Sequence, residues 1–312
     1  MSQCGYVLVG PTASGKSSVA EFIAKREGWH VLSADSMQVY EGLDIGTAKT
    51  PESEREGISY SGLDLVPITT RFTAWQYRQY AISVLRDYAA KHISTIVVGG
   101  SGLYVRALTE GLREVPDSDP EFHKRWMSVM EECGIDGLQK KLEDVFPGLL
   151  EQVQDPQNPR RLIRAAERYE ASGEVGEENW RPVAEQPVIT GLRWESGPLR
   201  ARIFQRVDQM YNCGLLDEAE RLIDRGLSDS PTARQALGYQ EAMLCLDGVM
   251  TESEARERTV TRTWQLAKRQ MTWFRHQANV DWIDVDDAMS TDGIAEKVMH
   301  SWRKYGAAEI PD

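Results

Sequence analysis

The residues that most clearly predict chemistry form one run near the start of the chain: Gly10, Pro11, Thr12, Ala13, Ser14, Gly15, Lys16 and Ser17. They fit the phosphate-loop pattern G-x-x-x-x-G-K-[ST] at every fixed position. Glycines let the backbone fold closely around an anion, the loop amides point at phosphate oxygens, and Lys16 adds a positive charge. Ser17 offers a hydroxyl to a Mg²⁺ ion, which typically accompanies a di- or triphosphate. The run therefore predicts a site for a ligand with a diphosphate or triphosphate group.

The segments on either side of this run support the same interpretation. Residues 6–9 are a short apolar segment typical of a buried strand, and residues 18–25 have apolar side chains at helical spacing. A strand, a glycine loop and a helix in this order are the structural context that the pattern requires. The alternative, a glycine turn before an ordinary helix, does not account for all the fixed positions.

A second candidate group follows the next predicted strand, residues 29–33. In open α/β sheets, ligands bind beyond the carboxyl ends of the strands, so Asp35 is expected to face the phosphate loop. Its carboxylate suits a general base or a water-mediated magnesium ligand, and the alternative is a helix N-cap. The amide of Gln38 suits paired hydrogen bonds with adenine, or equally a solvated turn. Residues 44–51 are predicted to form a turn-rich loop near this site.

A glycine-rich segment, residues 99–104, follows a third predicted strand at residues 93–98. Many phosphate-loop ATPases have an acidic residue at the end of such a strand, where it holds magnesium. Gly99 and Gly100 occupy that place here, which indicates a pocket opened for a ligand. The sequence thus points away from nucleotide hydrolysis.

The whole chain sets the limits on these candidates. It has 312 residues, 41% of them hydrophobic, and a net charge of -12. No apolar run approaches the 18 residues of a membrane span, and the strand at residues 6–9 leaves no space for a signal peptide. The four cysteines lie far apart, which suits reduced thiols better than a zinc site or disulfides. We therefore expect a cytoplasmic protein without a membrane segment, and a monomer.

Four predicted strands, at residues 6–9, 29–33, 93–98 and 187–192, alternate with helical segments. This alternation predicts an α/β fold with a phosphate-loop NTPase-like parallel sheet flanked by helices. From residue 116 onward the pattern becomes helical, which predicts a small all-helical insertion domain. The predicted division is residues 1–115 plus 187–312 for the core and 116–186 for the insertion. The last third is predicted to be helical, with helices at 199–211, 215–223 and 259–277.

Two basic clusters interrupt this acidic chain. Arg160, Arg164 and Arg168 recur every four residues and so share a helical face, beside acidic residues that partly neutralise it. Between residues 256 and 275, six basic residues are interleaved with tryptophans, as stacking and phosphate contacts to unpaired RNA would require. A solvated helix face and buried tryptophans are the alternatives at the two places.

Six phrases occur together in an order that is highly specific. They are the phosphate loop at 10–17, Asp-Ser-Met-Gln-Val-Tyr at 35–40, Asp-Ile-Gly-Thr-Ala-Lys at 44–49, the glycine segment at 99–104, Gly-Tyr at 238–239 and Ala-Lys-Arg-Gln-Met-Thr-Trp-Phe-Arg at 267–275. Over nearly its full length the chain resembles the bacterial tRNA dimethylallyltransferases, also called tRNA isopentenyltransferases. The resemblance implies transfer of the dimethylallyl group from dimethylallyl diphosphate to N6 of adenosine 37, in tRNAs that read codons beginning with U. The products would be N6-dimethylallyladenosine and diphosphate.

The resemblance also assigns roles to single residues. Asp35 matches the family's general base, and Ser101 stands where the family usually has threonine, with a hydroxyl retained. Arg206 matches a diphosphate-binding arginine. Gly10 to Ser17 are expected to bind the prenyl diphosphate, and not ATP, together with Mg²⁺ at Ser17.

The positions implied to contact the tRNA anticodon stem-loop come from four parts of the chain. They are Asp35, Ser36, Met37 and Gln38; Ser101; His123 with Arg160, Arg161, Leu162, Ile163 and Arg164 in the insertion; and Lys268, Arg269 and Arg275. The chain departs from the family at His123, where many relatives have arginine. It departs again at residues 60–64, where Tyr-Ser-Gly-Leu-Asp replaces His-His-Leu-x-Asp.

Three other functions compete with this one. A nucleotide kinase shares the loop and the sheet but requires ATP and a lid of arginines. A prenyltransferase of free AMP, ADP or ATP needs neither the arginine-bearing insertion nor the basic aromatic helix. An RNA-binding protein with an inactive phosphate loop is disfavoured by intact Lys16, Ser17 and Asp35.

Overall fold

The computed structural model describes residues 3–55, 57–112, 119–153, 155–173, 180 and 186–311. The chain forms two compact units, residues 1–112 with 182–312 and residues 113–181. The predicted division at 115/116 and 186/187 stays a prediction, because residues 113–118 and 181–185 lie outside the described part. Each unit is considered by itself below.

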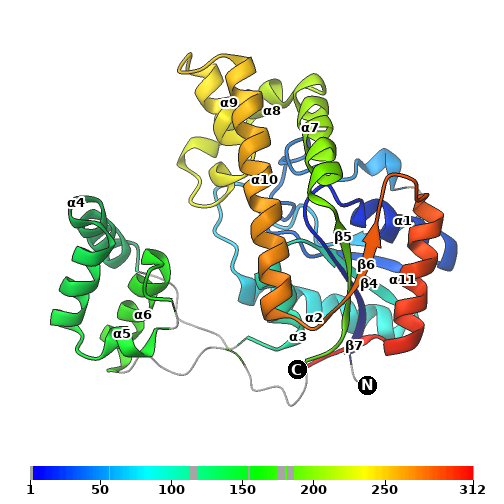
Figure 1. Ribbon diagram of the computed structural model, residues 1–312, viewed down its shortest axis with the longest axis horizontal. Helices are drawn as coiled ribbons and strands as arrows, with labels where there is room; N and C mark the ends of the chain where they lie inside the picture. Colours follow the sequence, from blue (N-terminus) through cyan, green and yellow to red (C-terminus); the bar gives the residue numbers. More distant parts are fainter. Residues whose placement is uncertain are drawn as a thin grey trace. The chain divides into compact units, whose positions relative to one another are not determined.

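The first unit is built on a parallel sheet (Figure 1). Its strands are β1 (Gln3–Val9), β2 (His30–Ser33), β3 (Ser59–Ser61), β4 (Thr95–Gly99), β5 (Ile189–Trp194) and β6 (Val280–Val285), in the order β3-β2-β4-β1-β5-β6. The short β7 (Ala308–Ile310) pairs antiparallel with the start of β1. The predicted fold class, a parallel sheet flanked by helices, is confirmed.

Helices cover both faces of this sheet, which explains why its central strands are buried along most of their length. Successive strand residues point to opposite faces. The backbone of Gly5 faces Leu85 of α2 (Ala74–Ala90), and the ring of Tyr6 lies 5.2 Å from that of Trp302 in α11 (Thr291–Tyr305). Helix α1 (Lys16–Glu27) packs beside α11, and α3 (Gly102–Thr109) packs beside α2. The resulting core leaves the carboxyl ends of the strands for the site.

Local sequence signals set the ends of several helices. Helix α1 starts after Gly15, whose φ of 83° is left-handed, and such a conformation favours glycine. Thr73 with Gln76 forms a capping box at the start of α2, and Thr251 with Glu254 forms another at the start of α10 (Glu252–Gln277). The strands predicted at residues 6–9 and 29–33 and the helix predicted at residues 18–25 are found close to these positions, as β1, β2 and α1.

The C-terminal third is only partly helical, so that prediction was wrong in part. Its helices are α7 (Ser196–Asn212), α8 (Leu215–Ile223), α9 (Tyr239–Leu246), α10 and α11, with short 3₁₀ turns at Leu227–Asp229 and Ala233–Gln235 and, earlier in the chain, at Glu52–Glu54. The edge strand β6 was missed because Asp281 and Asp284 interrupt its apolar pattern. Edge strands commonly carry such charges, which discourage unwanted pairing.

The second unit is a small helical bundle with its own core. It contains α4 (Pro120–Val145), which kinks at Gly134, and the shorter α5 (Leu149–Gln152) and α6 (Pro159–Ser172). Asp119 and Asn158 cap α4 and α6, each followed by a proline that suits the first helical turn. The core includes Phe122, Trp126, Leu138, Leu142, Phe146, Leu162 and Ile163.

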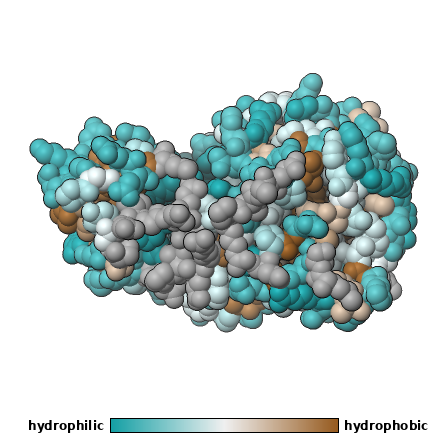
Figure 2. Space-filling view, turned by 90° about the horizontal axis from the view of Figure 1, so that it is seen from below, coloured by the Kyte–Doolittle hydropathy of each residue, from teal (hydrophilic) through white to brown (hydrophobic). Residues whose placement is uncertain are grey.

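The described surface is mainly hydrophilic in the view of Figure 2, with small separate hydrophobic areas. In the described part of the chain, no helix combines the length and the apolar character that a bilayer crossing needs. All four cysteines are free thiols. These findings agree with the sequence-based expectation of reduced cysteines.

Candidate active site

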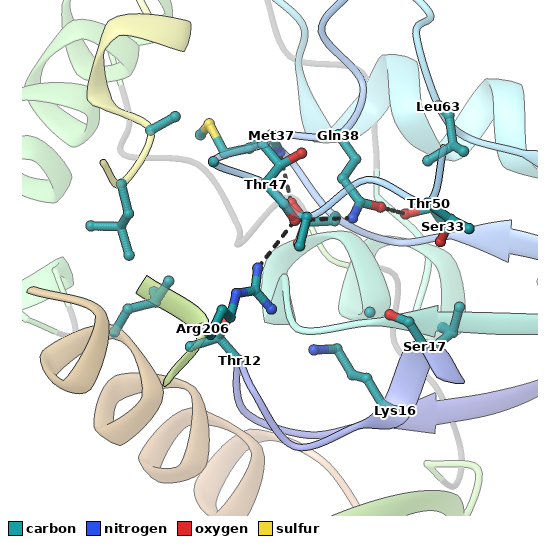
Figure 3. A pocket seen from close by; sticks show the side chains of 18 of the residues that line it. Thr12, Lys16, Ser17, Ser33, Met37, Gln38, Thr47, Thr50, Leu63 and Arg206 are labelled. Atoms are coloured by element: carbon teal, nitrogen blue, oxygen red, sulfur yellow. Dashed lines mark hydrogen bonds between the residues drawn. The ribbon is translucent and has the colours of Figure 1, made fainter. Parts of the chain in front are cut away.

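A cavity of about 110 Å³ lies where the carboxyl ends of the strands meet the C-terminal helices (Figure 3). Its polar lining comes from the phosphate loop, the end of β2, the loop before residue 50 and α7, and includes Thr12, Lys16, Ser17, Asp35, Gln38, Thr47 and Arg206. Its apolar lining comes from several elements and includes Met37, Leu63, Val98, Met210, Leu237 and Leu266. An adjoining hollow of about 530 Å³ shares Lys16, Ser17 and Arg206. The cavity can therefore hold a ligand with a charged end and an apolar end.

The phosphate loop is held in shape by side chains from distant parts of the sequence. The Thr12 amide donates to Gln270 Oε1 at 2.8 Å, and Gln270 Nε2 donates to the Gly100 carbonyl at 3.0 Å. Arg202 Nε donates to the Ala13 carbonyl at 3.0 Å, where Ala13 has a left-handed φ of 62°. The loop is thus fastened to α7 and α10 before any ligand binds.

Lys16 and Arg206 bring positive charge to the same cavity. Lys16 Nζ donates to the Pro11 carbonyl at 3.3 Å. Burial lowers the pKa of Lys16 to about 8, the Asp35 carboxylate opposes this shift, and the Arg206 charge adds to it. Burial also lowers the pKa of Arg206, again against the effect of Asp35. Two desolvated cations facing one cavity favour an anionic ligand.

Asp35 makes a local turn contact and also lines the cavity. Its Oδ1 accepts a hydrogen bond from the Met37 amide at 2.9 Å, which is a local turn-capping contact. Its side chain nevertheless lines the cavity with Lys16 and Arg206. The Ser101 hydroxyl accepts from the Ser36 amide at 2.9 Å and donates to the Ser36 hydroxyl at 3.1 Å. Ser101 therefore fixes the turn that carries Asp35.

Gln38 is engaged within the protein. Ser33 Oγ donates to Gln38 Oε1 at 2.8 Å, and Gln38 Nε2 donates to the Thr47 carbonyl at 3.3 Å. Because both ends of the amide have partners, pairing with an adenine would require these bonds to rearrange. The side chain still lines the cavity, beside Asp35.

The residues present fit a Mg²⁺ ion that takes most of its ligands from a bound diphosphate and water. The Ser17 hydroxyl and the Asp35 carboxylate line the same cavity. Among the described residues, no group of three or more His, Cys, Asp or Glu side chains is arranged to hold a metal by itself. Mg²⁺ is bound in many phosphate sites through only one or two protein oxygens.

In the helical unit, the predicted tRNA contacts divide into two groups. Arg160 and Arg161 are exposed, His123 is half-buried, and Arg164 pairs with Glu167 on the next turn. Leu162 and Ile163 are fully buried in the core of this unit. The prediction that these two residues contact tRNA is therefore corrected: their side chains support α6 from within.

The basic residues of α10 also divide. Arg256 pairs with Asp208 and Glu252, while Arg258 and Arg262 both reach Glu241. Lys268, Arg269 and Arg275 are exposed, and no described acidic residue pairs with them. Trp273 is half-buried and packs so closely on Gly102 that a Cβ at residue 102 would overlap its ring. The three exposed residues remain available for an anionic partner.

Sequence reasoning missed four residues that shape the site. Gln270 holds the phosphate loop. The Thr47 carbonyl accepts hydrogen bonds from Arg206 and Gln38. Glu218 and Tyr239 hold the loop that contains Thr47. Gln270, Thr47 and Tyr239 lie within the phrases that carried the resemblance, which was the available signal. Glu218 gave none, because the loop amides that it binds, those of Asp44 and Ile45, are more than 170 residues away in the sequence.

The sequence of the chain is similar to those of one family of known proteins. The pattern of the IPP transferase family matches residues 38–277. The chain belongs to the IPP transferase family. A tRNA dimethylallyltransferase of Anoxybacillus flavithermus is 37% identical over 298 residues, covering 94% of both chains, and that of Streptomyces griseus is 39% identical over 279 residues, covering 88% of both.

Two solved structures are similar to this chain. A tRNA isopentenylpyrophosphate transferase from Bacillus halodurans is 33% identical with a TM-score of 0.69, covering 97% of this chain and 98% of its own. A eukaryotic dimethylallyltransferase acting on tRNA is 24% identical with a TM-score of 0.74, covering 96% of this chain and 78% of its own. The second similarity concerns the fold alone.

Proposed function

We propose that this IPP transferase transfers the dimethylallyl group of dimethylallyl diphosphate to N6 of adenosine 37 in tRNAs that read codons beginning with U. The observation that carries the proposal is one cavity that combines Lys16, Arg206 and Asp35 with an apolar wall. The cations suit a diphosphate, the apolar wall suits a five-carbon chain, and the carboxylate suits proton removal. The names of the relatives agree with this reaction.

In the proposed reaction, the N6 atom of adenine forms a bond to the first carbon of the allyl group. The bond from that carbon to the diphosphate oxygen breaks, and its electron pair leaves with the diphosphate. Lys16, Arg206 and the loop amides stabilise the charge on that leaving group. Asp35 accepts the proton that N6 loses, which matters because the amine lone pair is delocalised into the ring.

Mg²⁺ fits this proposal as a partner of the diphosphate. The Ser17 hydroxyl would hold it, and the bound ion would supply further charge stabilisation to the departing diphosphate. The phosphate loop then serves prenyl diphosphate, and ATP has no role in the reaction.

The tRNA side of the proposal uses the exposed cations. Lys268, Arg269 and Arg275 on α10 and Arg160 and Arg161 on α6 suit phosphate contacts of the anticodon stem-loop. Adenosine 37 has to leave its stack to reach a cavity of this kind. The enzyme is proposed to act as a monomer in the cytoplasm.

The test is an incubation of the protein with dimethylallyl diphosphate, Mg²⁺ and unmodified tRNA, followed by mass spectrometry of the nucleosides. We expect one dimethylallyl increment on one adenosine, and none when AMP replaces tRNA. The Asp35→Asn variant should lose about 10²- to 10⁴-fold in turnover, a range typical of a missing general base, with tRNA affinity nearly unchanged. Transfer to AMP alone would replace tRNA with a free adenylate as substrate. Equal losses in turnover and tRNA affinity would remove Asp35 as the base.

A further inference from the structure

We infer that Tyr239 and Glu218 are positioning residues, which hold the loop of residues 44–49 so that the Thr47 carbonyl anchors Arg206 beside the phosphate loop. Both side chains are buried and lie behind that loop, outside the lining of the cavity. The inference rests on the proposed function, since it concerns how the diphosphate end of the substrate is bound.

The two side chains form a clamp on three consecutive backbone amides. The Glu218 carboxylate accepts from the Asp44 amide at 3.2 Å and from the Ile45 amide at 3.0 Å. The Tyr239 hydroxyl accepts from the Gly46 amide at 3.1 Å and donates to Glu218 Oε1 at 2.5 Å. One carboxylate and one phenol therefore satisfy a turn of backbone that forms no regular secondary structure.

The fit between the loop and the Tyr239 ring is close. A Cβ at residue 46 would overlap the ring, so only glycine permits this approach. The far end of the loop is fixed by Lys49, whose buried ammonium donates to the Tyr40 carbonyl at 3.0 Å, to Asp44 at 2.7 Å and to Asp64 at 2.5 Å. Asp64 is the last residue of the 60–64 segment and matches the Asp that ends the family's His-His-Leu-x-Asp. The loop is thus held from both ends.

On the side that faces the cavity, the loop holds Arg206 and Gln38 through the Thr47 carbonyl. The Thr47 carbonyl accepts from Arg206 Nη2 at 3.2 Å and from Gln38 Nε2 at 3.3 Å, as the dashed lines of Figure 3 show. Arg206 Nε is buried without a partner in the described part of the chain. The Thr47 carbonyl therefore anchors the guanidinium and leaves its Nε for a ligand. A shift of Thr47 would displace Arg206 and Gln38 together.

The Tyr239→Phe variant tests the clamp, because it keeps the ring and removes only the hydroxyl between Gly46 and Glu218. Binding of inorganic pyrophosphate with Mg²⁺ is measured by calorimetry, and the KM values for dimethylallyl diphosphate and tRNA are measured separately. We expect pyrophosphate affinity to fall about tenfold, the size of effect that loss of one buried hydrogen bond can produce. The KM for dimethylallyl diphosphate should rise by a similar factor, and the KM for tRNA by less.

Tyr211→Phe is the matched control. The Tyr211 hydroxyl is also buried and shares a hydrogen bond of 3.0 Å with Thr259, between α7 and α10, away from the loop of residues 44–49. Both variants lose one buried hydroxyl group, so both should lose thermal stability, and Tyr239→Phe should lose more because its hydroxyl makes two hydrogen bonds. Only Tyr239→Phe should weaken pyrophosphate binding.

A pH profile adds a readout that a purely structural role would not move. Burial raises the pKa of Glu218, and the hydrogen bond from Tyr239 opposes that rise. The titratable groups facing Glu218 are Tyr239 from α9 and Asp44 from the loop, whose carboxylate pairs with Lys49. Without the phenol hydroxyl the Glu218 pKa rises further, so Glu218 takes up a proton at a higher pH. As the pH is lowered, pyrophosphate binding by Tyr239→Phe should therefore begin to weaken at a higher pH than binding by the wild type.

The outcomes separate this inference from the proposed function. If Tyr239→Phe binds pyrophosphate like Tyr211→Phe, with the same pH profile, the clamp is only structural and the inference is overturned. A Glu218→Leu variant, which removes the acceptor of both loop amides, should repeat the loss if the inference holds. If the wild type binds pyrophosphate but transfers no prenyl group to tRNA, the proposed function fails while the clamp is still measurable.

Discussion

The protonation of Lys16 depends strongly on its surroundings. Burial of its ammonium lowers its pKa, and the positive charge of the neighbouring Arg206 guanidinium lowers it further. Its nearest fixed partner is only the Pro11 carbonyl, at 3.3 Å. A bound diphosphate would supply the missing negative charge and restore a high pKa. Binding and protonation of Lys16 are therefore linked.

This linkage predicts a pH dependence of diphosphate binding. Lys16 is charged below its pKa of about 8 and progressively neutral above it. Affinity for dimethylallyl diphosphate should thus be constant below pH 8 and fall above it, approaching about tenfold for each further pH unit. Calorimetry from pH 7 to 9.5 with Mg²⁺ measures this directly.

Lys16→Arg is the control for this prediction, since a guanidinium does not titrate in that range. Its affinity should be lower overall but nearly constant with pH. A wild-type profile that stays constant to pH 9.5 would show that Lys16 keeps its proton without a ligand, contrary to the expected effect of burial.

At the scale of single elements, helix α6 presents arginines that differ in their engagement. Arg164 pairs with Glu167, whereas Arg161 is exposed and reaches Asp155 only at 3.6 Å. Exposed pairs of this kind contribute little to stability, so Arg161 can exchange its partner for a phosphate. A solvated face remains the alternative for this helix.

Arg161→Ala should weaken tRNA binding and reduce the slope of log Kd against log salt by about one. Filter binding or calorimetry across a range of salt concentrations provides the slope. Arg125→Ala is the matched control, because Arg125 is an exposed arginine of α4 with an equally loose ion pair, 3.7 Å from Glu170. Identical slopes for the wild type and both variants would assign α6 a solvated face.

Elements with a strong local signal were predictable from the sequence, and elements defined by tertiary contacts were not. The phosphate loop with α1 and the buried strand β4 have patterns contained in a few neighbouring residues. Strand β6 was missed because Asp281 and Asp284 break its apolar pattern, and only its pairing with β5 identifies it as a strand. Periodicity reports burial on one element at a time and cannot register an edge position.

The same limit applies to the site. Lys16, Asp35 and Arg206 were identified before the structure, and all three line one cavity. The structural role of Gln270 was not, although this residue joins the phosphate loop to Gly100. For Trp273 the sequence left burial and stacking on RNA open, and the structure shows this residue half-buried against Gly102. Contacts between residues 170 or more positions apart leave no local pattern to recognise.

At the scale of the whole molecule, the net charge of -12 works against binding of a polyanion. Acidic neighbours also neutralise part of the positive charge of α10, because Arg256, Arg258 and Arg262 form ion pairs. We therefore expect tRNA binding to depend on a few exposed cations at separate places. Removing one whole group of them should weaken binding more than its share of the charge suggests.

The separate cores of the two units allow that removal. The core of the first unit contains residues of that unit only, as does the smaller core of the helical unit. A variant in which a short Gly/Ser linker replaces residues 113–181 should therefore still unfold in one cooperative transition. It should bind dimethylallyl diphosphate with nearly unchanged affinity, because Lys16 and Arg206 remain in place, and bind tRNA at least about tenfold more weakly, since several phosphate contacts are lost.

Calorimetry of both ligands and a thermal melt test this variant, with full-length Lys16→Ala as the opposite control. That control should lose affinity for dimethylallyl diphosphate and keep its affinity for tRNA. Together the two variants test whether diphosphate binding and tRNA binding depend on different parts of the chain. Unchanged tRNA affinity in the shortened variant would locate recognition entirely on the first unit and would leave Arg160 and Arg161 without a role in it.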